Sequence, residues 1–203
     1  MTSLLPQRQP QQTPGLQDRA IDNVRFIRET MERATSFTAV SGRGQVAVGI
    51  TALGAAFIAA HQGSADAWLL CWLVEAVFAL SIAVYTTTRK ARMCNVAVLT
   101  GPGRRFVLGF APPFVAGALL TVALYRSGLV TLMPAMWLLL FGAGVTTAGA
   151  FSAPIVPLMG LAFMGAGTVA LALPPAWGTV VMAAGFGGLN IVFGVLIARR
   201  HGG

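Results

Sequence analysis

The stretch WLLCWLVEAVFALSIAVYTTTRKAR, residues 68–92, decides the fold class of this chain. Its apolar part, which we place at 67–86, has the roughly 20 residues that an α-helix needs to cross the hydrocarbon core of a bilayer. Near its midpoint lies Glu75, the only charge in the middle of any apolar segment of the chain. The stretch ends in three basic residues, which are expected to fix its orientation in the membrane.

The composition of the whole chain also indicates a membrane protein. Of its 203 residues, 56% are hydrophobic and 10% are charged, whereas a soluble domain carries about 25% charged residues. The formal net charge of +8 would indicate a nucleic-acid partner if the basic residues formed one face of a soluble domain. Here they lie between apolar segments, so we expect a lipid bilayer around the protein and no nucleic acid as a partner.

Six apolar segments predict an all-α fold, a polytopic bundle of six transmembrane helices. We place them at 44–60, 67–86, 106–125, 129–150, 155–173 and 177–198, followed by a tail at 199–203. If the N-terminus is cytoplasmic, thirteen of the fourteen Lys and Arg residues fall on the cytoplasmic side and only Arg126 on the other. The positive-inside rule therefore predicts that both termini are cytoplasmic.

A polar region precedes the membrane domain. Residues 1–15 are rich in Gln and Pro, a composition typical of a disordered tail. Residues 16–36 predict a cytoplasmic amphipathic helix, because apolar side chains recur every three or four residues along it. This apolar stripe could pack on the protein's own cytoplasmic loops, dock onto a partner, or lie on lipid. We call it the docking stripe; its members are Val24, Ile27, Met31 and Ala34.

Small residues at helical spacing predict close contacts between the membrane helices. Helices in lipid associate where their backbones can approach one another. In the last segment, Gly187, Asn190 and Gly194 share one face, and Gly142 lies among several small residues of the fourth segment. Such faces are expected to serve packing.

Glu75 is the sharpest functional candidate. A charged side chain at the bilayer centre costs about 2.5–3.5 kcal/mol on insertion scales, so we expect it to face the bundle. Asn190 is the best placed polar partner by depth, and Thr51 is the next. Together these three residues form a candidate intramembrane polar site, either for a proton or cation or for a neutral acid held by hydrogen bonds. Because other polar groups are few, we expect dry packing, with no continuous polar cavity reaching Glu75.

The loop expected at 87–105 carries five basic residues and a Gly-Pro-Gly turn. Basic residues near a membrane surface attract anionic headgroups by about 1 kcal/mol each. The cluster either binds such headgroups or only sets the topology. Its members are Arg89, Lys90, Arg92, Arg104 and Arg105.

The run DRAIDNVRFIRETMERA at 18–34, followed by SFTAVSG at 36–42, resembles the start of an uncharacterised family of bacterial multi-pass membrane proteins. The resemblance covers about residues 18–50. It implies a bacterial cytoplasmic (inner) membrane as the location, and it brings no known activity with it.

The sequence shows no pattern of a catalytic or metal site. His61 and His201 are isolated, and Cys71 and Cys94 lack the spacing of a metal or redox motif. Hydrolase, metalloprotease and phosphate-binding motifs are also lacking, so we expect no cofactor and no metal. The leading expectation is a non-catalytic accessory or scaffold subunit that acts through a membrane-protein partner or as a homo-oligomer. The alternative is a small proton- or cation-coupled transporter that uses Glu75.

Overall fold

The computed structural model describes residues 21, 27, 40–93, 101–150 and 152–201. The chain divides into two compact units, Met1–Thr35 and Ser36–Gly203. In the first unit only Ile21 and Ile27 are described; both are helical and exposed. The tail expected at 1–15 and the other members of the docking stripe lie outside the described residues, so the docking of this stripe stays a prediction.

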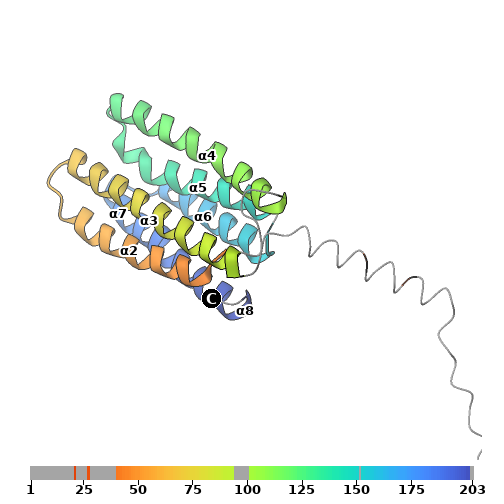
Figure 1. Cartoon of the computed structure of the whole chain (residues 1–203). Helices are drawn as coiled ribbons and strands as arrows, with labels where there is room; N and C mark the ends of the chain where they lie inside the picture. Colours follow the sequence, from red (N-terminus) through yellow and green to blue (C-terminus); the bar gives the residue numbers. More distant parts are fainter. Residues whose placement is uncertain (1–20, 22–26, 28–39, 94–100, 151, 202–203) are drawn as a thin grey trace, which may run out of the picture. The chain divides into compact units, whose positions relative to one another are not determined.

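The described part of the second unit is helical and contains no strand (Figure 1). Six helices within it are long and apolar enough to cross a membrane, which confirms the expected all-α fold with six spans. The first five spans are α2 (Gly42–Ala60), α3 (Ala65–Met93), α4 (Gly101–Arg126), α5 (Met133–Gly149) after the short 3-10 turn η1 (Val130–Leu132), and α6 (Ile155–Ala172).

The sixth span is built from four consecutive pieces. They are the 3-10 turn η2 (Pro175–Trp177), α7 (Gly178–Met182), the π-helix η3 (Ala183–Leu189) and α8 (Asn190–His201). A π-helix inside a span is rare, and such insertions are frequent at functional sites.

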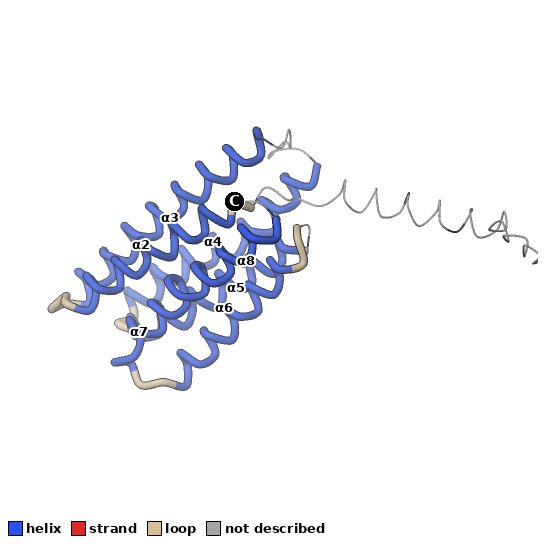
Figure 2. Tube along the Cα trace, turned by 90° about the horizontal axis from the view of Figure 1, so that it is seen from below, coloured by secondary structure: helices blue, strands red, loops and turns tan. Residues whose placement is uncertain are grey.

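The spans run side by side, with loops at the two ends of the bundle (Figure 2). The last span is central: it packs against α2 and also contacts α5 and α6. Beyond these, α3 packs on α2 and α4 packs on α5, but α3 and α4 are not packed on one another. These two helices therefore expose long apolar faces, as expected for surfaces that meet lipid.

Glycines allow the closest helix contacts. A Cβ atom on Gly142 of α5 would lie 2.6 Å from the carbonyl oxygen of Gly160 in α6. Between α2 and the last span, a Cβ on Gly49 would lie 2.7 Å from the carbonyl oxygen of Gly187, and one on Gly194 would lie 2.8 Å from that of Gly42. Backbones touch at these points, as the small residues in the sequence predict.

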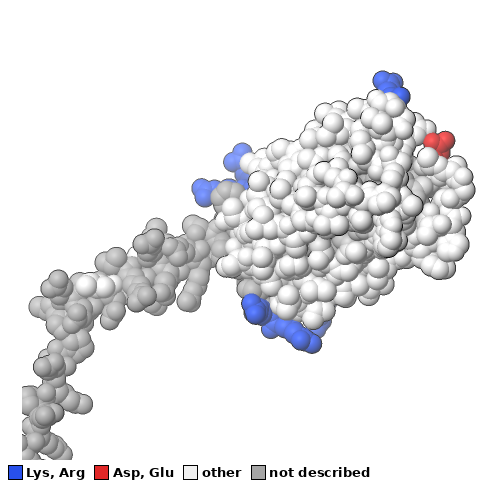
Figure 3. Space-filling model, turned by 180° about the vertical axis from the view of Figure 1, so that it is seen from behind, with Lys and Arg blue, Asp and Glu red and all other residues white. Residues whose placement is uncertain are grey.

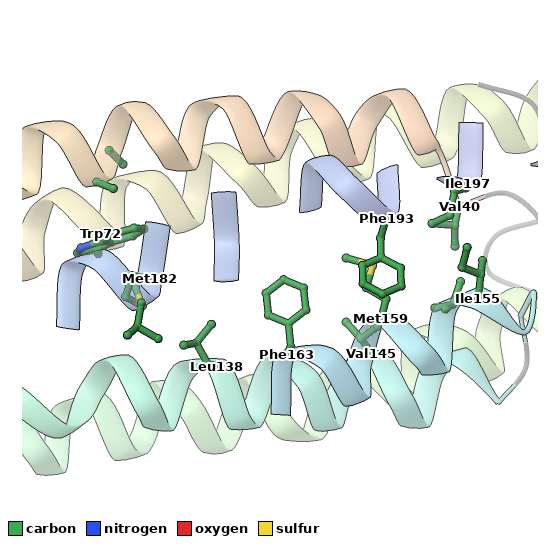
Figure 4. Close-up of a cluster of buried hydrophobic side chains, with 14 of the residues drawn as sticks. Val40, Trp72, Leu138, Val145, Ile155, Met159, Phe163, Met182, Phe193 and Ile197 are labelled. Atoms are coloured by element: carbon green, nitrogen blue, oxygen red, sulfur yellow. The ribbon is translucent and has the colours of Figure 1, made fainter. Parts of the chain in front are cut away.

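The hydrophobic core lies between α5, α6 and the last span. Leu138, Met159, Phe163 and Met182 are among its fully buried side chains. In Figure 4, Phe163 lies near the middle of this cluster and Trp72 of α3 at one end. The core is thus on the side of the last span that faces α5 and α6.

The helix α3 is seven residues longer at its C-terminal end than the apolar segment expected at 67–86. Threonine hydroxyls donate to carbonyl oxygens one turn earlier, Thr86 to Ile82 at 2.8 Å and Thr88 to Val84 at 2.7 Å. These hydroxyls are thus hydrogen-bonded within their own helix where the apolar segment ends.

Basic side chains gather at one end of the described bundle, which we call the basic end (Figure 3). The basic cluster expected in the loop 87–105 lies instead in the last turns of α3 and the first turn of α4, and residues 94–100 are outside the described part. The Lys90 ammonium donates to the Val40 carbonyl oxygen at 3.1 Å. The basic end carries Arg43, Arg89, Lys90, Arg92, Arg104, Arg105, Arg199 and Arg200, whereas Asp66 and Arg126 lie at the opposite end.

Candidate functional site

A groove lies between α3 and α4, where these helices are not packed on one another. Its cavity volume is about 320 Å³. Leu73 and Leu80 of α3 and Phe114 of α4 line it and are exposed, so it is open on this side. Its lining on α4 runs from Phe110 to Thr121, and the rise of the helix between these two residues is roughly 17 Å. We call this feature the lateral groove.

The lining of the lateral groove is mostly apolar. Residues from α2, α3, α4, α5 and the last span contribute to it. Only four of the lining residues are polar, namely Gln45, Glu75, Thr121 and Asn190. The structure therefore differs from the dry packing expected around Glu75, because a cavity reaches this residue. The apolar lining also means that the cavity is no polar channel.

Glu75 is half-buried on α3 and turned towards α2. The Thr51 hydroxyl donates to Glu75 Oε1 at 2.8 Å, and it also lies 2.9 Å from the Val48 carbonyl oxygen. Among the described residues, no Lys, Arg or His forms an ion pair with this carboxyl group. Thr51 is thus its one hydrogen-bond partner in this part of the chain, and the carboxyl group has no counter-charge there.

Asn190 does not pair with Glu75, and the expectation that it would is wrong. Its side chain is fully buried, and Nδ2 donates to the Phe186 carbonyl oxygen at 2.8 Å. This bond runs within the helix of Asn190 itself, to the carbonyl oxygen one turn earlier, whereas its backbone N–H bonds to the Gly187 carbonyl oxygen. Both Glu75 and Asn190 nevertheless line the lateral groove.

Two buried polar atoms in the groove wall have no hydrogen-bond partner among the described residues. One is the acceptor Asn190 Oδ1, and the other is the donor Nε1 of Trp72, a residue only 4% exposed. Buried polar groups in proteins nearly always have a partner. Both residues line the lateral groove, but the two atoms themselves are buried in its wall.

Aromatic rings form a continuous wall along the groove. The ring of Phe110 lies 4.4 Å from that of Phe114 and meets Phe141 edge to face at 6.0 Å. Phe141 in turn meets Phe186 edge to face at 5.2 Å, and Phe186 lies 6.5 Å from Trp72. We call these five rings the aromatic wall. No expectation from the sequence included this wall, although Phe110 and Phe114 lie one turn apart in α4.

At the end of the groove opposite the basic end, side-chain contacts connect its two sides. The ring of Trp68 stacks on that of Trp137 at 5.9 Å, and Trp137 Nε1 donates to Thr121 Oγ1 at 2.8 Å. Close by in the chain, the Tyr125 hydroxyl donates to Asp66 Oδ1 at 3.0 Å. These contacts tie α3 and α5 to α4, so the two sides of the groove are fixed there.

The remaining candidates lie elsewhere. None of the five members of the basic cluster lines the lateral groove. Within the described part of the chain, no group of three or more His, Cys, Asp or Glu side chains is placed to hold a metal ion.

No protein-family model, curated protein or solved structure matches this chain. The geometry of the lateral groove is therefore the basis for assigning a function to the chain.

Proposed function

We propose that this protein is a non-catalytic binding protein of the membrane, which holds one lipophilic molecule in the lateral groove. The groove itself supports this proposal. Its volume of about 320 Å³ falls within the roughly 300–1,000 Å³ of small-molecule sites. A small lipophilic guest is therefore a suitable occupant of the groove.

A small transporter is the second candidate. Glu75 and Asn190 stand on different helices and line one cavity, and Asn190 directly follows the π-helix η3. Transporters often build their sites from polar groups beside interrupted helices. An accessory subunit, which the sequence favours, would instead use the outer faces of the bundle to contact its partner.

Filling the groove should abolish binding of a neutral lipophilic probe. Ala118 lines the groove on α4, so Ala118→Phe places a ring inside it. We expect the affinity for N-phenyl-1-naphthylamine to fall at least tenfold. Binding can be followed by energy transfer from tryptophan to the probe, because Trp72 and Trp137 line the same groove.

Ala123→Phe is the matched control for this measurement. Ala123 is exposed on the same helix and does not line the groove. This variant should bind the probe as the wild type does. Equal affinities of the two variants would contradict the proposed function.

We further propose that the basic end faces the cytoplasm, in the inner membrane of a bacterium. The distribution of Lys and Arg supports this orientation. A cysteine at Gln62, in the turn after α2, should react with an impermeant thiol reagent in intact cells once Cys71 and Cys94 are replaced by Ser. A cysteine at Gly203 should react only after permeabilisation. The opposite pattern would place the basic end outside.

A further inference from the structure

We infer that the guest of the lateral groove is a lipophilic organic cation with one positive charge, held by the Glu75 carboxylate and the aromatic wall. This inference rests on the proposed function and names the class of molecule that the groove would select. The charge of the lining, its aromatic rings and its remaining polar groups support it.

The charge of the lining has one sign. Among the described residues that line the groove, Glu75 is the only charged one and the others are neutral. The hydrogen bond from Thr51 supplies one neutral donor to Oε1, and the described basic residues form no ion pair with the carboxylate. In apolar surroundings the attraction between opposite charges is much stronger than in water. A cation that enters the groove therefore meets a partner, and an anion meets repulsion.

The aromatic wall favours the same sign of charge. The face of an aromatic ring carries negative charge density and attracts a cation within about 6 Å of the ring centre. Rings of Phe110, Phe114 and Phe141 line the groove on one side, and Trp72 and Phe186 complete the lining. A cation with a large apolar body can fill this space, so that burial of its apolar surface adds to the attraction.

An inorganic cation fits the groove poorly. Hard cations such as calcium bind six to eight oxygen ligands, and the groove brings together one carboxylate, one amide and one hydroxyl beside Gln45.

Two probes of equal shape and opposite charge test the inference, namely tetraphenylphosphonium and tetraphenylborate. Their binding is measured by equilibrium dialysis on the full chain in nanodiscs, with empty nanodiscs subtracted. The wild type should bind the phosphonium at least tenfold more tightly than the borate, although the net charge of the chain, +8, would favour the borate. Equal affinities, or a preference for the borate, would overturn the inference.

Glu75→Gln assigns this preference to the carboxylate. The variant should lose at least tenfold in affinity for the phosphonium, bind the borate more tightly than the wild type does because the repulsion is gone, and still bind N-phenyl-1-naphthylamine, which shows that the groove is intact. Glu75→Asp, which keeps the charge, should retain part of the preference. Glu75→Gln could instead bind the phosphonium as the wild type does, while Ala118→Phe abolishes binding of the neutral probe. That result would overturn the inference of a cationic guest and would leave the proposed binding function of the groove intact. If Ala118→Phe and Ala123→Phe bind every probe alike, the proposed function fails as well.

Discussion

Gly160→Leu should lower the free energy of unfolding of the bundle by at least about 3 kcal/mol, the upper end of the usual cost of overpacking. A Cβ atom at this position would lie 2.6 Å from the backbone nitrogen of Thr146 and 2.7 Å from the carbonyl oxygen of Gly142. Both are backbone atoms of α5, so no side-chain rotation can relieve the clash. The two helices must separate along the most extensive helix contact of the described bundle.

Gly165→Leu is the matched control, since it makes the same change on the same helix. A Cβ on Gly165 would meet nothing within 4 Å, so this variant should unfold as the wild type does or slightly later. Thermal unfolding of the purified protein in a mild detergent compares the two. A Gly160→Leu protein as stable as the control would contradict the close approach of α5 and α6.

Asn190→Asp should also destabilise the protein by at least about 3 kcal/mol. The fully buried amide of Asn190 donates to the Phe186 carbonyl oxygen at 2.8 Å, and an ionised carboxylate has no hydrogen to donate. The carbonyl would lose its partner, at a cost of about 1–3 kcal/mol. Charge at this depth adds an insertion cost of about 2.5–3.5 kcal/mol.

Asn190→Leu separates these two effects. It removes the hydrogen bond without introducing charge, and it also removes the acceptor Oδ1, which has no partner among the described residues. We expect a smaller loss, about 1–3 kcal/mol. Unfolding curves in the same detergent should rank the wild type first, Asn190→Leu second and Asn190→Asp last. Any other order would contradict the role assigned to the amide.

The spans could be predicted from the sequence because hydropathy and length determine which segments can cross a bilayer. The extent of α3 could not, because its last turns carry polar and basic side chains such as Lys90 and Arg92, which hydropathy places outside a span. Close contacts at glycines, such as that of Gly187 with Gly49, could also be predicted, because small residues at helical spacing are visible in the sequence.

The candidate site was predictable only in part. Glu75 stands out in the sequence, because an acid inside an apolar segment is costly. Asn190 bonds within its own helix to Phe186 and Thr51 bonds to Glu75, and no residue pattern revealed this choice beforehand. The lateral groove arises because α3 and α4 pack on different neighbours, which is a property of the assembled bundle. Spacing along one helix could not show that Phe110 and Phe114 face a cavity.

The π-helix also sets how the last span tolerates changes in its length. Loss of one residue between Ala183 and Leu189 can be absorbed, because the i→i+5 turns of the π-helix would then close as α-helical turns and the flanking halves would keep their orientation. Each residue of an α-helix turns the chain by about 100°, so an inserted residue would rotate everything after it by about that angle. The backbone of α2 fits closely against Gly187 and Gly194, and it would then face bulkier neighbours. We therefore expect this glycine-rich segment to accept the loss of one residue more readily than the gain of one, because only the gain changes the rotational phase between the two halves of the span.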